Sequence, residues 1–356
     1  MAVAAVLRRD ANSGRHGRVT GVKPWGVAAT ALLFTLACTP AVSQSSGEPA
    51  ARAAGGGTAT GAREHPRPGP GRRGGPQKGA PVKPEVPPGT TAGYVVFDRK
   101  ANKTLLHHNA TRRFRSASVI KILIAYDFLE SAERVSTADA AKIAAMLRSS
   151  DDDAASEFWR RGGRKKIVQR MARKIGLRHT TPPPDHKPGF WGYSSLSAQD
   201  VVRTYRYLLH GADRKIADVI LGHLRKATKC GSDGFDQSFG IPSAVPRPWA
   251  VKQGWSGFGT TPPARCADDA SGAAAAPPPA GQGAPASTNT DTTTIAAADG
   301  AVPDLGRPVL HTTGLVGGDD RFIMVVLTAH PAGSSWASSV ERTTALTERL
   351  YRAAAG

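Results

Sequence analysis

The chain has 356 residues, long enough for two domains, but residues 44–87 and about 262–303 are too poor in large apolar residues to contribute to a core. What remains predicts one domain of ordinary enzyme size. Lys and Arg number 47 against 28 Asp and Glu, a formal net charge of +19 that favours anionic partners such as a cell-wall polymer or a membrane surface. We exclude nucleic acid as a partner, because the basic residues are scattered, no recognised nucleic-acid motif occurs and aromatic residues are only 6%.

Residues 1–43 have the pattern of a bacterial export signal. Basic residues precede an apolar run over 25–37, which is too short for a stable membrane span. Two processing sites compete: Thr35-Leu36-Ala37-Cys38 resembles a lipobox with Cys38 as the lipidated residue, whereas Ala41-Val42-Ser43 suits ordinary signal peptidase. We prefer the lipoprotein, because a cysteine directly after the apolar run otherwise has no purpose. The predicted location is outside the cell, either secreted or anchored as a lipoprotein on the outer face of a bacterial membrane or in its wall.

Residues 44–87 consist mainly of Gly, Pro, Ala and Arg. Such a composition cannot bury enough apolar surface to offset the entropy of ordering the chain. We therefore predict a basic, disordered linker that could adhere to an anionic wall polymer or membrane surface, and we expect the folded domain over 88–356.

The folded domain is predicted to begin with a hairpin, with strands at 92–98 and 104–108 joined by a short turn. A helical region follows, and a Pro-rich loop over 180–193 interrupts it. Apolar periodicity and capping signals predict helices over 118–130, 136–147, 154–159, 164–175, 197–209 and 215–227.

Strand character returns at 249–255 and, after the low-complexity insertion at about 262–303, at 308–316 and 321–329. A closing helix is predicted over 334–354. Its expected buried face consists of Trp336, Val340, Leu346, Leu350 and Tyr351. This order predicts an α+β fold, in which an antiparallel sheet flanked by N- and C-terminal helices carries an inserted all-α subdomain.

Besides Cys38 the chain has two cysteines, Cys230 and Cys266. In an oxidising compartment such a pair favours a disulfide, the alternative being two unpaired buried thiols. We predict that they pair and tie the segment before the 249–255 strand to the start of the insertion.

The most informative stretch runs from Phe114 to Tyr126, where a short polar run ends and an apolar helix begins. Ser118 and Lys121 are three residues apart, so in a helix they share a face. A lysine at an apolar helix start loses hydration and can act as a neutral base, and the positive end of the helix dipole favours a deprotonated serine oxygen. Taken alone, the spacing is more typical of an N-terminal serine and a snorkelling lysine.

Two later motifs change that interpretation. Ser150-Asp151-Asp152 falls between two predicted helices, and Lys252-Gln253-Gly254 falls on a predicted strand. In order and position, the three motifs resemble the S-x-x-K, S-D-N and K-T-G motifs of the class A β-lactamase and penicillin-binding protein superfamily. The resemblance covers about 89–356 apart from the insertion, and it implies a β-lactamase/transpeptidase-like fold.

The resemblance also implies a role for each matching residue. Ser118 would be the acylated nucleophile, and Lys121 the group that takes or relays its proton. Ser150 would pass a proton toward the leaving nitrogen. The backbone N–H groups of Ser118 and Trp255 would form an oxyanion hole, which needs two donors aimed at the developing charge.

The strand motif would bind the substrate. Lys252 would bind the substrate carboxylate and keep the local potential positive, and Gly254 would let the substrate backbone approach the strand closely. Gln253 replaces the threonine of the family motif; it keeps a hydrogen-bonding side chain, but its greater length leaves the substrate preference open.

Asp152 departs from the family motif, which has asparagine at this position. A carboxylate only accepts hydrogen bonds, so Asp152 could pair with Lys121, weaken it as a base and repel an anionic substrate. Asp152 would then still belong to the catalytic site, but it would act on Lys121 differently from the asparagine of the family motif. Alternatively, Asp152 is simply a helix N-cap, a role that Asp153 can fill equally well.

The loop after Gly176 departs further. Class A enzymes carry there the glutamate that activates the deacylating water, whereas this chain has no glutamate between Leu177 and Ser197. Asp185 and His186 are the candidate substitutes, although both are more typical of a surface loop. Without that base, an acyl group would be released slowly.

The sequence therefore favours a secreted serine hydrolase that forms an acyl-enzyme at Ser118 with β-lactams or D-Ala-type wall peptides. The alternatives are a penicillin-binding or D,D-peptidase-like protein with slow deacylation, and a non-catalytic wall-binding relative. We expect no metal and no cofactor, because no residues have metal-ligand spacing and no phosphate-binding glycine loop occurs. We also expect a monomer. His107, His108 and His311 are interpreted as surface or structural residues.

Overall fold

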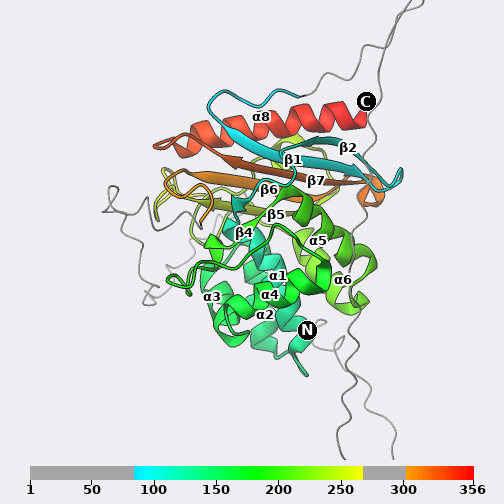
Figure 1. Ribbon diagram of the computed structural model, residues 1–356, viewed down its shortest axis with the longest axis vertical. Helices are drawn as coiled ribbons and strands as arrows, with labels where there is room; N and C mark the ends of the chain where they lie inside the picture. Colours follow the sequence, from blue (N-terminus) through cyan, green and yellow to red (C-terminus); the bar gives the residue numbers. More distant parts are fainter. Residues whose placement is uncertain (1–83, 268–301) are drawn as a thin grey trace, which may run out of the picture. The chain divides into compact units, whose positions relative to one another are not determined.

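The structure is a computed structural model that describes residues 84–267 and 302–356. The expected export signal with Cys38, most of the expected linker and most of the expected insertion lie outside the described residues. The N-terminal helix that we expected beside the sheet is not found among the described residues, in which the first element is a strand that begins at Thr91. Within the described residues, an antiparallel sheet has helices packed on both faces (Figure 1).

Five strands form the main sheet, in the spatial order β2-β1-β7-β6-β5, and all neighbours are antiparallel. The strands are β1 Thr91–Asp98, β2 Lys103–His108, β5 Trp249–Ser256, β6 Val309–Val316 and β7 Phe322–Ala329. Every residue of β6 and β7 is buried, because both strands lie inside the sheet and are covered on both faces. The strand with the third motif, β5, is an edge strand, with Lys252 opposite Thr313 of β6.

Helices gather on both sides of this sheet (Figure 1). One side has α5 against β1 and β7 and α6 against β5, together with the other helices of the predicted all-α subdomain. These helices are α1 Lys121–Ser131, α2 Thr137–Arg148, α3 Asp152–Arg161, α4 Lys165–Ile175, α5 Ala198–His210 and α6 Arg214–Leu224. The other side has α8 Trp336–Ala355 and the short α7 Ile241–Ala244. The predicted α+β class is confirmed.

The sheet separates two apolar cores, as the alternation of side chains along β1 shows. Val95 and Phe97 face the core formed with the helical subdomain, whereas Tyr94 and Val96 face the core formed with α8. Each face of β1 is therefore apolar, which explains why the strand lacks the polar alternation of a half-exposed strand.

The buried face of α8 differs in part from the prediction. Leu346 and Leu350 are fully buried as expected, but Trp336, Val340 and Tyr351 are only partly buried. Three hydroxyl residues are fully buried in addition: Ser339, Thr343 and Thr347. Ser339 Oγ and Thr347 Oγ1 each donate to a carbonyl one turn earlier, so small polar side chains can face the sheet without an unsatisfied donor.

A second, two-stranded sheet was not predicted. It pairs β3 Phe114–Arg115 with β4 Ser195–Leu196, and each strand is too short to show a periodic pattern. The chain then enters a 3₁₀ turn, η1 Ala117–Ile120, and α1 begins only at Lys121. The predicted single helix from Ser118 is thus a 3₁₀ turn followed by an α-helix.

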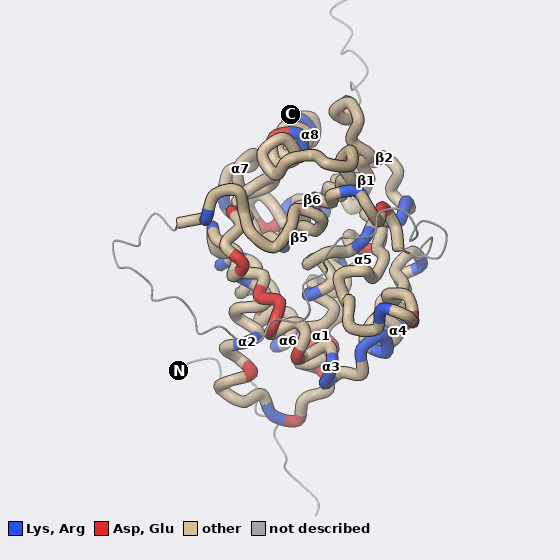
Figure 2. Tube along the Cα trace, turned by 90° about the vertical axis from the view of Figure 1, so that its left-hand side faces the viewer, with Lys and Arg blue, Asp and Glu red and all other residues tan. Residues whose placement is uncertain are grey.

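Basic residues are concentrated on α4, where five of eleven residues are Lys or Arg, drawn blue in Figure 2. The positive charge of the chain is therefore not confined to the segment predicted as a linker. Among the described residues, no helix is both long and apolar enough to cross a membrane.

Candidate active site

Ser118 lies in η1, directly after the two-residue strand β3, and only 6% of its surface is exposed. The preceding Ala117 has φ +44°, a conformation that costs a non-glycine residue of order 1–3 kcal/mol. Ser116 fixes this turn from both its backbone and its side chain. Its N–H donates to Ser194 O at 2.8 Å, and its Oγ donates to Gly192 O at 3.2 Å.

Lys121 is the first residue of α1, and its side chain is completely buried. Nζ donates to Ser150 O at 2.5 Å, to Asp152 Oδ1 at 2.5 Å and more weakly to Ser150 Oγ at 3.3 Å. The ring of Trp191 covers another side of Nζ, with its centroid 4.6 Å away. Within the described residues no hydrogen bond joins Nζ to Ser118 Oγ, because Nζ is directed at Ser150 and Asp152.

Ser150 stands between two lysines. Its Oγ accepts from Lys252 Nζ at 2.8 Å and from Lys121 Nζ at 3.3 Å, which leaves its own O–H free to donate in another direction. Burial, reinforced by the positive charge of Lys121, holds the pKa of Lys252 well below its ordinary value. A buried chain of donors and acceptors therefore runs from Lys121 through Ser150 to Lys252.

Gly254 permits a close approach between β5 and η1, the turn that contains Ser118. A Cβ at this position would lie 3.1 Å from Ser118 N and 3.1 Å from Val119 Cγ2. Any larger residue would push the strand away from η1. This packing puts the two backbone amides expected to form an oxyanion hole, those of Ser118 and Trp255, on facing elements.

Gln253 points to the opposite side of β5. Its side chain is 2% exposed, and Nε2 donates to Gln237 O at 3.1 Å and to Phe239 O at 2.5 Å. Strand alternation puts Lys252 and Gly254 on the face toward Ser118 and Gln253 on the other. The amide group that we expected to contact substrate is therefore bonded to backbone behind the strand.

Asp152 begins α3, and 68% of its side chain is exposed while one oxygen pairs with the buried Lys121. The expected pairing of a carboxylate with this lysine is present in the structure. The N-cap alternative was wrong for both Asp152 and Asp153, because Asp151 caps α3 by accepting a hydrogen bond from Ala154 N at 2.7 Å.

The loop that replaces the family's glutamate motif brings an aromatic residue to the site. Asp185 pairs with Lys165 Nζ at 2.8 Å, and 81% of its side chain is exposed. His186 is exposed as well. Trp191, in the 3₁₀ turn η2 Trp191–Tyr193, instead reaches Lys121, and its Nε1 donates to Ser156 Oγ of α3 at 3.1 Å.

Three residues around the site belong to no motif and were not expected there. Trp191 covers Lys121, Asp233 accepts a hydrogen bond from Trp255 Nε1 at 3.0 Å, and Gln237 binds Gln253. Only the proximity of the last two to Cys230 could have drawn attention to them. Of the histidines, His311 is buried within the sheet and His107 is exposed. In the described ranges, no group of three or more His, Cys, Asp and Glu side chains could hold a metal ion.

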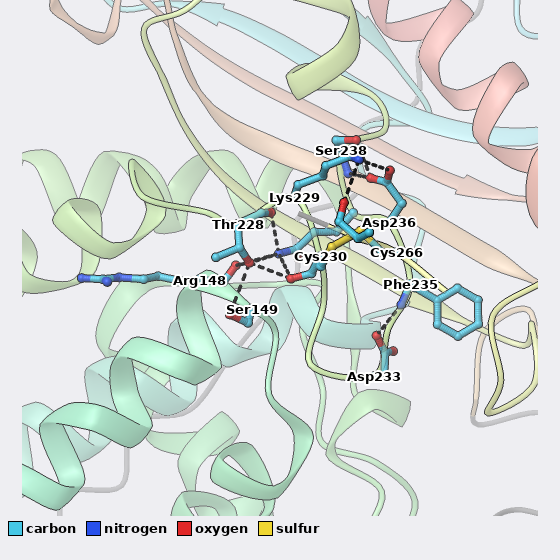
Figure 3. The surroundings of a disulfide bond; sticks show 12 residues. Arg148, Ser149, Thr228, Lys229, Cys230, Asp233, Phe235, Asp236, Ser238 and Cys266 are labelled. Carbon is cyan, nitrogen blue, oxygen red and sulfur yellow. Dashed lines mark hydrogen bonds and ion pairs between the residues drawn. A yellow bond between two sulfur atoms is a disulfide. The ribbon is translucent and has the colours of Figure 1, made fainter. Parts of the chain in front are cut away.

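The two remaining cysteines are joined. Cys230 and Cys266 form a disulfide with a Cα–Cα distance of 5.5 Å, across 36 residues of sequence (Figure 3). Cys230 belongs to the segment 228–237, which is hydrogen-bonded to the end of α2 directly before Ser150.

No family model matches the sequence. The curated relatives include "Putative lipoprotein LppW" of Mycobacterium bovis and of Mycobacterium tuberculosis, each 41% identical over 177 residues. That alignment covers 47% of this chain and 54% of the relative, so the chain spans about half the length of the curated relatives it matches.

Solved structures with the same architecture cover more of the chain. A β-lactamase from Sphaerobacter thermophilus has a TM-score of 0.50 at 16% identity, over 75% of this chain and 92% of that protein. A mutant of PBP-A, in an acyl-enzyme complex with penicillin G, has a TM-score of 0.50 at 14% identity, over 76% and 92%. A β-lactamase from Burkholderia vietnamiensis matches with the same score and identity over 75% and 92%. The described part of the chain therefore has the fold shared by these two β-lactamases and PBP-A.

Proposed function

We propose that the chain is an active-site-serine enzyme that is acylated at Ser118 by β-lactams or D-Ala-type wall peptides and releases the acyl group slowly. The observation that supports this most is the buried chain Lys121–Ser150–Lys252 beside a serine held in a strained turn. Two buried lysines converging on one hydroxyl are costly to a fold and have no evident structural use.

In the proposed reaction, Lys121 acts as a neutral amine, which requires that it first gives one proton to Asp152 or to solvent. Ser118 Oγ then attacks the carbonyl carbon of the amide, and its proton passes to Lys121. Backbone amides of Ser118 and Trp255 stabilise the oxyanion. The C–N bond then breaks, and the leaving nitrogen receives a proton from Ser150, which is replaced by the proton that Lys121 took from Ser118. Lys252 helps to hold Ser150 in place. Lys252 also supplies positive potential for a substrate carboxylate.

Slow release is supported by the loop 180–193. A hydrolytic water needs a base beside the acyl carbon, yet Asp185 is paired with Lys165 on the surface, and the residue of this loop that contacts Lys121 is the neutral Trp191. A penicillin-binding protein would show this behaviour, whereas a β-lactamase would turn over.

The test is covalent labelling by a fluorescent penicillin, with chromogenic cephalosporin hydrolysis measured in parallel. We expect a labelled band with wild type, no label with Ser118→Ala, and cephalosporin hydrolysis no faster than in Ser118→Ala. The matched control is Ser131→Ala, which removes an exposed hydroxyl from the far end of α1 and should label like wild type. Absence of label in the wild type would reject acylation, and hydrolysis well above the Ser118→Ala background would reject slow release.

A second candidate is a wall-binding protein that keeps the fold but not the chemistry. The ion pair between Lys121 and Asp152 favours it, because it engages the expected base. If wild type is unlabelled and Asp152→Asn gains no acylation, this candidate replaces the first.

We also propose that the protein is a lipoprotein anchored through Cys38 on the outer face of the membrane. The basic linker predicted over 44–87 would then lie against an anionic wall polymer or the membrane surface. The name of the mycobacterial relative supports the lipid anchor. Cys38→Ala should move the protein from the membrane fraction to the medium, and an unchanged membrane fraction would contradict the anchor.

A further inference from the structure

The segment 228–237 contacts two elements of the candidate site. One is the end of α2 with Arg148 and Ser149, directly before Ser150 (Figure 3), and the other is the strand β5. On the side of α2 it binds the last carbonyls of the helix and its cap. Thr228 N donates to Arg148 O at 3.2 Å, and Ser232 N donates to Ser149 O at 2.7 Å. The two residues directly before Ser150 are thus held by hydrogen bonds to their carbonyl groups.

Gln237 connects the same segment to β5 by hydrogen bonds. Its side chain is 2% exposed, and Nε2 donates to Arg148 O at 2.7 Å and to Thr228 O at 2.9 Å. Its backbone carbonyl accepts from Gln253 Nε2 at 3.1 Å, and Gln253 also donates to Phe239 O at 2.5 Å. Two buried glutamines therefore connect the end of α2 to the strand that carries Lys252.

Ser150 needs such support from its surroundings. It has φ +58°, a conformation that a serine keeps only when neighbouring contacts determine it. Its hydrogen bond to Lys252 Nζ, 2.8 Å long, joins residues 102 positions apart in the sequence. The geometry of that bond is therefore set by how the turn and the strand are held against each other.

The disulfide closes the outer side of the same segment. Cys230 is bonded to Cys266, whose N–H donates to Gly234 O at 2.8 Å. Between them, Asp233 accepts from the indole N–H of Trp255 at 3.0 Å, one residue beyond Gly254. Gln253 and Trp255, the residues of β5 on either side of Gly254, are thus both bound to a segment that the disulfide anchors.

We propose that Gln237 and Gln253 are positioning residues, which hold Ser150 against Lys252 through the disulfide-closed segment 228–237. This assignment rests on the proposed function for its effect on acylation. It also replaces the expected substrate contact of Gln253, and it gives the substitution of threonine a reason: only a longer side chain spans from β5 to Gln237 O and Phe239 O. The segment has no direct contact with the reacting atoms, so it acts through Ser150 and Lys252.

The experiment compares wild type with Gln237→Glu, which keeps the size of the side chain but removes the N–H donors that face two carbonyls. Acylation is followed against penicillin concentration, and hydrogen exchange is followed at the Ser232 amide. We expect the first-order acylation constant to fall by about tenfold at a nearly unchanged half-saturating concentration, and exchange at Ser232 to rise by about tenfold. If Gln237 only stabilises the fold, less protein will be labelled because less is folded, but the first-order acylation constant of the folded protein will be unchanged. That result would overturn the proposal.

Two further variants keep the test decisive if Gln237→Glu does not fold. Gln253→Thr shortens the side chain to that of the family motif, and it should slow acylation and speed exchange in the same direction. Gln199→Glu, on the first turn of α5, is the matched control and should change neither. Reducing the disulfide in wild type should reproduce the effect of Gln253→Thr. An unchanged acylation rate after verified reduction would show that the disulfide does not help to hold Ser150 against Lys252. If wild type is not acylated by penicillin, the proposed function fails, while hydrogen exchange at Ser232 still decides the positioning role.

Discussion

At the scale of single residues, Asp152 decides how available Lys121 is. Its carboxylate pairs with the buried ammonium at 2.5 Å and is largely open to solvent. We predict that Asp152→Asn raises the acylation rate by penicillin about tenfold, equivalent to about 1.4 kcal/mol in the barrier. The reasons are that an amide binds the lysine less strongly and that it no longer repels an anionic substrate.

The control is Asp153→Asn, which removes the same charge from the next, exposed position of α3. Stopped-flow or quenched labelling gives both rates. Equal rates in the two variants would show that the ion pair does not restrain the lysine.

Gly254 is the second residue on which the site depends, because of its contact with η1. We predict that Gly254→Ala lowers acylation about a hundredfold, since its Cβ would lie 3.1 Å from the Ser118 amide, and this nitrogen belongs to backbone that cannot easily move. The protein should remain folded, because β5 is an edge strand.

Gly222→Ala is the matched control for this prediction. It lies in α6 with nothing within 4 Å of the added methyl group, and it should stabilise the fold by about 0.5–1 kcal/mol without affecting acylation. Rates of labelling and urea unfolding curves measure the two effects. Normal labelling of Gly254→Ala would contradict the close approach of β5 to η1.

At the scale of elements, His311 joins three strands near the nucleophile. Its Nδ1 accepts from Thr328 N of β7 at 3.2 Å, so its Nε2 carries the proton and donates to Arg115 O of β3 at 2.8 Å. Burial lowers the pKa of His311 to about 4 from its ordinary value of 6.5. A second proton on the ring would remove the acceptor that Thr328 needs.

The lowered pKa fixes the direction of a pH effect on stability. The unfolded chain binds a proton at this histidine below pH 6.5 and the folded protein only below about 4, so stability is complete above 6.5 and is lost as pH falls toward 4. The loss due to His311 should be about 2 kcal/mol between pH 7.5 and pH 5. His223 and His330 have the same lowered pKa, also about 4 and also chiefly from burial, and add to it.

We predict that His311→Gln shows a smaller loss of unfolding free energy between pH 7.5 and pH 5 than wild type, by about 2 kcal/mol. Urea titrations at both pH values measure it. His107→Gln, which changes an exposed residue of β2, should keep the wild-type pH dependence. A His311→Gln variant as sensitive to pH as wild type would show that this ring is not held neutral by the fold.

The same scale shows how far the sequence could predict the elements. β1 and α5 were predicted within one or two residues. A short continuous apolar run marks a strand that is buried on both faces, and an apolar stripe with the helical period marks α5. β3 and β4 could not be predicted, since two residues carry no period, and their pairing depends on segments about eighty residues apart. The hydroxyl residues on the buried face of α8 were missed because polar residues were assigned to solvent.

The candidate site was predictable to a similar degree. Ser118 and Lys252 could be named as candidates from the sequence, because each lies in a motif of a few consecutive residues. Gln253 was expected at the substrate, since the sequence does not show that a segment sixteen residues earlier offers it two carbonyl acceptors. Trp191 carried no signal at all, because its contact with Lys121 depends on the path of a Pro-rich loop.

At the scale of the whole molecule, the disulfide cross-links the segment after α6 to the chain beyond β5. By the chain-entropy estimate, closing a loop of this size adds about 4 kcal/mol, and measured values are commonly lower. We predict that the double variant Cys230→Ser with Cys266→Ser loses about 2–4 kcal/mol of unfolding free energy.

Reductant provides the control for this prediction. It should destabilise wild type by a similar amount and leave the double variant unchanged in urea unfolding. Two free thiols in the denatured, unreduced domain, or a double variant as stable as wild type, would contradict the pairing.

The central claim is that Ser118 is acylated and that the acyl group stays. Intact-mass spectrometry of the wild-type protein mixed with penicillin G, followed over hours after removal of excess penicillin, tests both parts at once. We predict a mass increase of one penicillin on a peptide containing Ser118, with most of the adduct still present after several hours. A wild-type protein without adduct, or an adduct that disappears within minutes to give hydrolysed penicillin, would contradict the claim.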